Sequence, residues 1–385
     1  ERQIRLRVQR WQLESPFQEV PPRSSMSLRA SGDPSATGMG YFGGLLRDRL
    51  GCRPMEGTFL AWGLTRLGVG VPGASPPAEL SLSPQDGMRM ACRKILRAEA
   101  WRMRASFHGA RRDIDPEYVH DFRVATRRSR FALKLFAGIL PEGAADHMRG
   151  ELAWIAGLLG AIRDVDVLHA RLEAQFLLME AGADFQAAIR GRLGVARGRA
   201  QEEMSAALQS ERCLFLLNTL ENTPGAAGED AEGSGAVDAA SPAFLARRRI
   251  DKAFAQLQRW RGRPAEELQD TELHRLRILF KRLRYTCDFF RPILTPRVGE
   301  LIKSFVSYQD CLGLHHDAVV ALEILKGLPH GQPSDSEEYA MSLGALMQVQ
   351  RTVLKEQRAR FLDLWQTADA LVASWKEGDD REGKA

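Results

Sequence analysis

The chain has 385 residues, of which 44% are hydrophobic and 27% charged, and its formal net charge is +5. This composition is that of a globular protein and excludes disordered, collagenous and coiled-coil chains. The length suits two compact units or one larger duplicated unit, with a core that needs no disulfides. Five widely spaced cysteines without a C-x-x-C pair exclude a disulfide framework and a zinc site, and they predict a reducing compartment, the cytosol.

The N-terminal segment is rich in Pro and Gly. Residues 1–84 hold 9 of the 18 prolines and 11 of the 34 glycines, and we find no sustained helical or alternating period there. We therefore predict a poorly ordered extension over residues 1–83. Arginines interrupt the first ten residues, and no apolar run approaches the roughly 18 to 20 residues that cross a bilayer. Neither a signal peptide nor a membrane partner is expected.

After residue 84, long stretches rich in Ala, Leu, Arg and Glu are broken at Gly or Pro, which is typical of helices joined by short loops. One set of helices is predicted over residues 84–221 and a second over 242–374, followed by a charged tail at 375–385. Residues 222–241, rich in Gly, Ala and acids, have the composition of a linker. The predicted helices are 86–107, 116–139, 147–161, 164–179 and 184–221, and then 242–260, 270–291, 296–312, 315–326 and 336–374.

The two sets share a composite motif. Each contains a histidine followed by cations at i+3, i+7 and i+10, and the second copy starts 154 residues after the first. Each copy also has a further arginine at i+8 and, downstream, a Leu-Gly pair followed by an aspartate. Matched composite motifs predict an internal duplication in an all-α fold. The first copy comprises His120, Arg123, Arg127, Arg128, Arg130, Leu159, Gly160 and Asp164; the second comprises His274, Arg277, Lys281, Arg282, Arg284, Leu312, Gly313 and Asp317.

Each motif places a row of cations on one helix face. At about 100° per residue, the histidine and its three cations fall within an arc of about 80°. Apolar residues lie on both sides of the row, such as Val119 and Phe122 on one side and Phe131 on the other. Because a solvated face would have polar neighbours, we predict that both rows face inward, along a groove or tunnel between helices.

Positive charge is concentrated around these rows. Residues 86–136 hold 13 Lys or Arg against 6 acids, and residues 247–297 hold 14 against 6. Inward-facing cations repel one another and lose hydration, so they persist only beside acids or a bound anion. Arginine predominates, and its planar guanidinium suits phosphate oxygens. A linear polyanion is the simplest ligand, also reached by the basic first helix of each set through Arg93, Lys94, Arg97, Arg247, Arg248 and Lys252.

The segments VHDFRVATRRSRFALKLF and LHRLRILFKRLRYTCDFF, each followed by LGAIRDVDVL or LGLHHDAVVA, resemble the two halves of the CHAD family, the conserved histidine α-helical domain. The resemblance covers residues 84–374. It implies two pseudo-symmetric helical bundles around a central basic cavity, binding of inorganic polyphosphate and, in several members, association with polyphosphate granules. By position, the family's signature residues fall on the two rows and on Tyr285.

Two departures bear on catalysis. The second copy has His315-His316-Asp317 where the family usually has Arg-Asp, and residues 1–83 lack the E-x-E-x-K signature of the CYTH domain that is often fused to this one. His274, His316 and Asp317 suggest a metal-dependent phosphohydrolase as an alternative. The first copy has Arg163 in place of His316, and arginine is not a metal ligand. We therefore expect no catalytic residue, no metal and no cofactor, and Asp164 and Asp317 are expected to cap helices or pair with arginines.

Nucleic acid is the main rival ligand, because an Arg-rich groove attracts any phosphate backbone. Single-strand binders usually place aromatic platforms among their basic residues, and in these rows only Tyr285 is available for that role. A helical scaffold that binds an acidic peptide is a third alternative. We predict a cytosolic, non-enzymatic polyphosphate-binding protein, with polyphosphate-metabolising enzymes or granule proteins as further partners.

Overall fold

The computed structural model describes residues 4–11, 23–30, 75–141, 143–179, 183–223, 241–326 and 337–382. Helices dominate the described residues, which confirms the predicted all-α class. The first half contains α3 (Met88–Arg111), α4 (Pro116–Leu135), α5 (Ala144–Met179), α6 (Ala183–Gln209) and α7 (Glu211–Glu221). The second half contains α9 (Pro242–Arg261), α10 (Asp270–Phe290), α11 (Val298–Lys326), α12 (Glu337–Gln366) and α13 (Ala368–Glu382).

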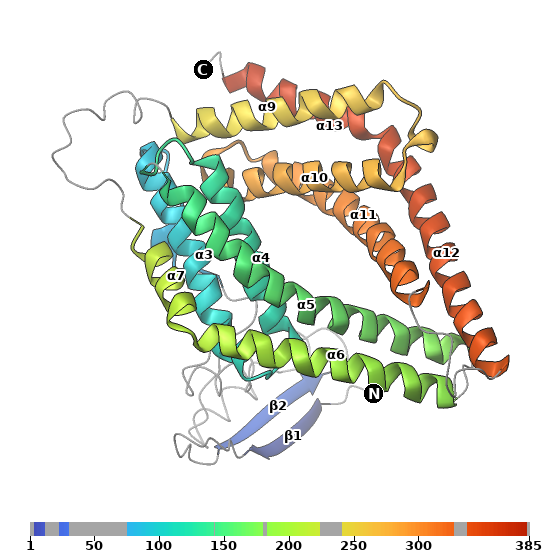
Figure 1. Cartoon of the computed structure of the whole chain (residues 1–385). Helices are drawn as coiled ribbons and strands as arrows, with labels where there is room; N and C mark the ends of the chain where they lie inside the picture. Colours follow the sequence, from blue (N-terminus) through green and yellow to red (C-terminus); the bar gives the residue numbers. More distant parts are fainter. Residues whose placement is uncertain are drawn as a thin grey trace.

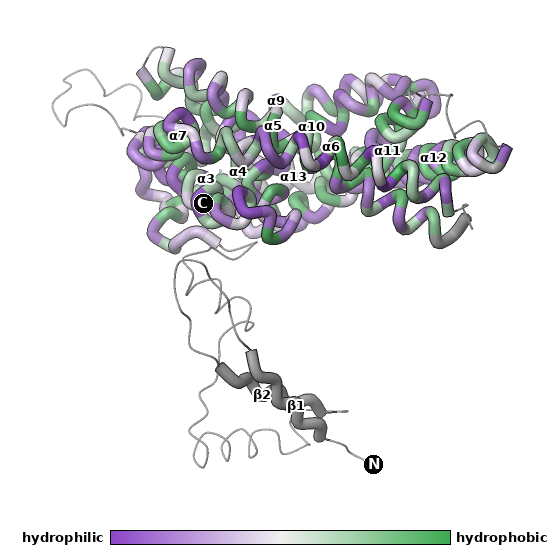
Figure 2. The backbone as a smooth tube through the Cα atoms, turned by 60° about the horizontal axis from the view of Figure 1, so that its bottom comes forward, coloured by the Kyte–Doolittle hydropathy of each residue, from purple (hydrophilic) through white to green (hydrophobic). Residues whose placement is uncertain are grey.

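Local sequence signals start the helices that position the site. Asp115 precedes α4, accepts a hydrogen bond from the Glu117 amide, and is followed by proline at the first helical position. Ser241 and the following proline start α9 in the same way. A reciprocal capping box between Gln269 and Glu272 starts α10. Figure 2 shows hydrophilic and hydrophobic residues following one another along the helices, as expected when one face of each is buried.

Three apolar clusters hold the helices together. The first lies among α3, α4, α5, α6 and α7, the second lies within α9 to α13, and the third joins α5 and α6 to α11 and α12. In Figure 1 the helices form a frame, with α5 and α6 along one side, α12 along the next and α9 with α10 along a third. The halves meet at the third cluster and also where Tyr285, Phe289 and Phe290 of α10 join the first cluster.

Two predicted helix breaks do not exist. Residues 147–161 and 164–179 belong to the single helix α5, and residues 296–312 and 315–326 fall in the single helix α11. The prediction placed one break shortly after Gly160 and the other at Gly313, but a glycine costs a helix only about 1 kcal/mol, and in α5 the packing of fully buried Leu159 and Ile162 offsets this cost. Asp164 and Asp317 therefore lie inside helices, so the prediction that they cap helices is wrong and the predicted pairing with arginines remains.

Two predicted helices are instead divided. Ser210 ends α6 and caps α7 by accepting a hydrogen bond from the Cys213 amide, so residues 184–221 form two helices. Residues 336–374 divide into α12 and α13, and α13 continues to Glu382. The prediction of a charged tail from residue 375 is therefore wrong, because Trp375 packs against Phe254 and its Nε1 donates to Asp251.

The N-terminal segment also differs from its prediction. Strands β1 (Ile4–Trp11) and β2 (Arg23–Ala30) pair antiparallel, with Ile4 opposite Ala30. The alternation of Ile4, Leu6 and Val8 with polar residues is the signal that the prediction of a poorly ordered extension missed. Leu82 is buried in the first apolar cluster, so packed structure also begins before residue 84. Residues 31–74 and most of the predicted linker, 224–240, lie outside the described residues.

No helix in the described ranges is long and apolar enough to cross a membrane.

The close approach of α3 and α4 depends on Gly109. A β-carbon at this position would overlap the ring of Tyr118, which is itself fully buried. We expect Gly109→Ala to lower the free energy of unfolding by about 1 to 3 kcal/mol, the usual cost of overpacking a core. Urea denaturation measures the effect. The matched control is Gly157→Ala in α5, where nothing lies within 4 Å and alanine should stabilise the helix. Equal effects of the two substitutions would contradict the close contact.

Candidate functional site

Four cations from the two halves form one cluster. Arg123 and Arg127 come from α4, Arg277 and Lys281 come from α10, and all four side chains are half-buried. Burial lowers the pKa of Lys281 to about 7, helped by the charges of Arg127, Arg277 and Arg123 and opposed by Asp317. The charges of Arg123 and Arg127 on α4 therefore act on the Lys281 amine on α10, which indicates that the two rows converge. We call these four residues the cationic cluster.

The cationic cluster has few acids beside it. Burial lowers the pKa of Arg123 and of Arg277, and each of them also feels the charge of Arg127. The Oδ1 atom of Asp164 lies 3.7 Å from Arg123, while Asp317 is bound to Arg171 of α5 at 2.8 Å. The Nε atom of Arg277 is buried without a hydrogen-bond partner in the described structure. Positive charge therefore exceeds negative charge here, as an anion site requires.

The histidines extend this cationic region. Burial lowers the pKa of His120, His274 and His316, and the charge of a neighbouring arginine lowers each further. The His274 and His316 rings lie 4.6 Å apart, and the buried Nδ1 of His274 has no hydrogen-bond partner in the described structure. His315 instead is buried and faces Asp270 at 3.3 Å. A bound anion would favour the protonated forms of His120, His274 and His316.

An aromatic seam lies on one side of the cationic cluster. The Arg127 Nε donates a hydrogen bond of 2.6 Å to the hydroxyl of Tyr285, whose side chain is only 4% exposed. The Tyr285 ring packs against Phe131 of α4, and Phe131 also stacks on Phe289. Phe131, which the sequence places on one apolar side of the α4 row, therefore lies at the contact between the two halves. This contact, together with the third apolar cluster, holds the rows toward each other.

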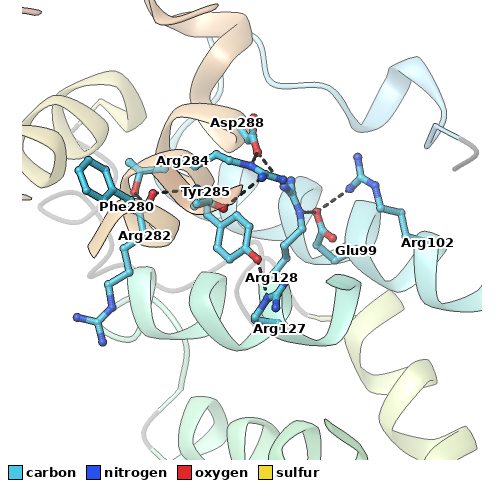
Figure 3. Close-up of polar contacts among 11 residues, drawn as sticks. Glu99, Arg102, Arg127, Arg128, Phe280, Arg282, Arg284, Tyr285 and Asp288 are labelled. Atoms are coloured by element: carbon cyan, nitrogen blue, oxygen red, sulfur yellow. Dashed lines mark hydrogen bonds and ion pairs between the residues drawn. The ribbon is translucent and has the colours of Figure 1, made fainter. Parts of the chain in front are cut away.

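Arg128 does not belong to the cationic cluster, and its predicted role as a ligand contact stays a prediction. Its side chain is 12% exposed and bonds to Glu99 of α3 at 2.9 Å and to Asp288 of α10 at 3.2 Å. It also lies over the Phe289 ring at 4.6 Å. Figure 3 shows this network, in which Glu99 also binds Arg102. Arg128 therefore pairs with acids of two other helices and joins α3, α4 and α10.

Arg284 also has partners within the protein. It contacts Asp288 at 3.5 Å and the Gln309 side chain at 3.2 Å, although its predicted place is on the inward row. Arg282 is exposed and extends away from the Arg128 network in Figure 3. Lys94 is bound to Asp86 at 2.9 Å. The remaining predicted contacts that lie exposed, without a place in the cationic cluster, are Arg93, Arg97, Arg130, Arg248 and Lys252, while Arg247 is half-buried.

Two residues of the site were missed. Arg163 lowers the pKa of His120 and of Arg123, and Arg171 binds Asp317 from the other half. Arg163 was considered only as the counterpart of His316. Arg163 lies in the predicted break within α5, and Arg171 lies in the predicted helix that follows it. A continuous helical period through Gly160 would have placed Arg163 near α4.

The metal-site alternative has no support from the geometry. Among the described residues, the ligand atoms that converge within 4.8 Å belong to Glu117, His120 and Asp121, and not to His274, His316 and Asp317. The pKa of His316 is instead lowered by burial and then by the charges of Arg277 and His274. The positive charge of Arg277 would repel a metal ion bound at His316. The geometry fits an anion better than a metal ion.

Comparisons with known proteins agree with the fold. The model of the CHAD domain family matches residues 94–326. The crystal structure of the CHAD domain from the plant Ricinus communis is 27% identical, with a TM-score of 0.57 over 79% of this chain and 97% of that chain. PptA from Streptomyces chartreusis is 20% identical, with a TM-score of 0.57 over 73% of this chain and 100% of that one, a likeness of fold alone. No curated protein matches. Since the family model covers more than half of the sequence, the chain belongs to the CHAD domain family.

Proposed function

We propose that this protein binds inorganic polyphosphate without catalysis, and that the cationic cluster is the binding site. The observation that supports the proposal is the convergence of Arg123, Arg127, Arg277 and Lys281 from two helices beside few acids. Each guanidinium is suited to phosphate oxygens, and a phosphate chain carries charge along its whole length. Such a chain neutralises cations from both halves at once. We place this activity in the cytosol, where polyphosphate granules and their enzymes are the expected partners.

The position of Tyr285 favours a bare phosphate chain over nucleic acid. Its ring is buried between Phe131 and the arginines, and its hydroxyl accepts the bond from Arg127. A ring held in this way is not available to stack on a base, which removes the aromatic platform that the nucleic-acid alternative requires. His274 and His316 are half-buried, and burial together with the charge of Arg277 lowers the pKa of each.

A competition assay tests the choice of ligand. The purified protein is retained on immobilised long-chain polyphosphate and then challenged with free polyphosphate or single-stranded RNA at equal phosphate concentration. We expect free polyphosphate to displace the protein at much lower concentration than RNA, with strong salt dependence in both cases because counterions are released. Equal or better competition by RNA would overturn the proposed ligand.

Binding should weaken as the pH rises through neutrality. The amine of Lys281 has a pKa of about 7 in the empty protein, so it is charged below this pH and neutral above it. A polyanion stabilises the charged form, which means that binding takes up a proton near neutral pH. We expect the dissociation constant to increase between pH 6 and pH 8.5. Titrations in several buffers of different protonation enthalpy measure the proton uptake.

Lys281→Gln is the matched control for this pH dependence. The variant lacks the titrating amine of Lys281. The ligand and the histidines His120, His274 and His316 still titrate as in the wild type, so their contribution to the pH dependence is unchanged. We expect weaker binding with a shallower dependence above pH 7. The stability of the ligand-free wild-type protein has the opposite pH dependence. Between about pH 7 and 10.5 the Lys281 amine is protonated in the unfolded state and largely neutral in the folded state. The free energy of unfolding therefore increases as the pH rises through this range. An unchanged pH profile in the variant would contradict the role of Lys281.

A further inference from the structure

A second group of cations surrounds a pocket on another face of α10. The pocket has a volume of about 220 Å³ and lies where the end of α4 meets α9 and α10. Its floor is apolar and includes Phe131, Leu279 and Leu283. We call it the outer pocket. Its cationic lining consists of Lys134, Arg249, Lys252 and Arg282.

The outer pocket carries positive charge without compensation. No acid is among its lining residues, and none of its four cations forms an ion pair with a described acid. Surface cations usually lie among acids, as Arg212 lies beside Glu151 elsewhere in this fold. Four cations around one concave, partly apolar surface raise the local positive potential and attract an anion. The volume is below the roughly 300 to 1,000 Å³ of pockets for organic ligands, so a compact anion fits best.

The outer pocket is distinct from the cationic cluster. Arg282 follows Lys281 directly, which turns its side chain about 100° around α10, away from the cluster. The Tyr285 ring lies between the two sites, because its hydroxyl binds Arg127 of the cluster while its ring packs against Phe131 of the pocket floor. None of the four residues of the cationic cluster is among the lining residues of the outer pocket.

We propose that the outer pocket is a second anion site, which takes a few phosphoryl units of condensed phosphate. The choice of condensed phosphate as the ligand rests on the function proposed above; the anion site itself rests on the pocket. Lys134 belongs to the first half and the other three cations to the second, so a bound anion bridges both halves beside the seam. The phosphoryl units come either from free oligophosphate or from a segment of a longer chain.

Calorimetric titration of four proteins tests the proposal. The outer variant is Arg249→Gln with Arg282→Gln, and the cluster variant is Arg123→Gln with Arg277→Gln. A charge-matched control, Arg259→Gln with Lys303→Gln, removes two exposed cations that do not line the pocket. Each protein, including the wild type, is titrated with tripolyphosphate and with long-chain polyphosphate. The substituted side chains of the outer variant are exposed, so thermal unfolding should show an intact fold.

We expect the outer variant to lose one class of sites and the charge-matched control to keep both. Loss of tripolyphosphate binding by about tenfold or more identifies free oligophosphate as a ligand, since each lost contact to a charged group accounts for roughly one order of magnitude. A loss confined to the long chain identifies a polymer segment. The proposal is overturned if the titration curves of the outer variant match those of the wild type. It is also overturned if the charge-matched control loses as much affinity as the outer variant. If only the outer variant loses binding, the proposed function of the cluster fails and the outer site stands.

Discussion

Removing two cations from either half of the cationic cluster is expected to weaken polyphosphate binding by at least about a hundredfold. The two variants are Arg123→Gln with Arg127→Gln in α4, and Arg277→Gln with Lys281→Gln in α10. A contact to a charged group contributes about 1.5 to 3 kcal/mol, so two lost contacts correspond to about 3 kcal/mol or more. Because cations from both helices share one region, neither half should retain full affinity. Fluorescence or calorimetric titration measures the loss.

The empty variants should unfold at the same temperature as the wild type or at a higher one. Glutamine keeps much of the aliphatic packing and removes charges that repel one another, since burial and neighbouring arginines lower the pKa of Lys281 and of Arg277. Polyphosphate should raise the melting temperature of the wild type strongly and that of either variant weakly, because a ligand of the native state stabilises it. The matched control is Lys303→Gln with Arg351→Gln, two exposed cations outside the predicted binding residues. Full ligand stabilisation in one half's variant would contradict a shared site.

The rows of cations were predictable because helical spacing is a local property. The spacing of His120, Arg123 and Arg127, and of their counterparts in α10, fixes one face of each helix before any tertiary contact is known. Two neighbour relations agree with this correspondence: Arg123 lies beside Gly160 and Arg277 beside Gly313, with Nε 3.9 and 4.0 Å from the position that a β-carbon would occupy at each glycine. The duplication as a whole remains a prediction. Helix ends were less predictable, since tertiary packing carried α5 and α11 through their glycines.

The partners of individual arginines were not predictable from spacing. Arg127 and Arg128 are adjacent and chemically identical, yet one faces the cationic cluster and the other binds Glu99 and Asp288. Those acids lie 29 and 160 residues away along the chain, so only the packing of α3, α4 and α10 brings them to Arg128. The same limit applies to Arg171 and Asp317, which pair across the two halves. A row of charges indicates a face, and tertiary structure decides which of its members are free to bind a ligand.

Glu99→Gln is expected to destabilise the fold by about 3 kcal/mol, the lower end of the cost of breaking a buried ion pair by removing one partner. Glu99 is 1% exposed and binds both Arg128 and Arg102. The substitution leaves the nearly buried Arg128 with Asp288 as its remaining acid, and this acid keeps the effect at the lower end of the range. Urea denaturation measures the change. Asp288→Asn is the matched comparison and should cost less, since Asp288 is more exposed and its contact with Arg128 is longer.

A double variant separates charge from packing at the same position. Arg128→Met in the Glu99→Gln background removes the cation that has lost one of its two acids, while an apolar side chain still covers the Phe289 ring. We expect the double variant to be more stable than Glu99→Gln alone, because replacing a buried ion pair by apolar groups of similar volume is often neutral. Below its melting temperature it should bind polyphosphate like the wild type, since Arg128 does not contact the ligand in this proposal. A loss of affinity comparable to that of the cluster variants would return Arg128 to the binding site.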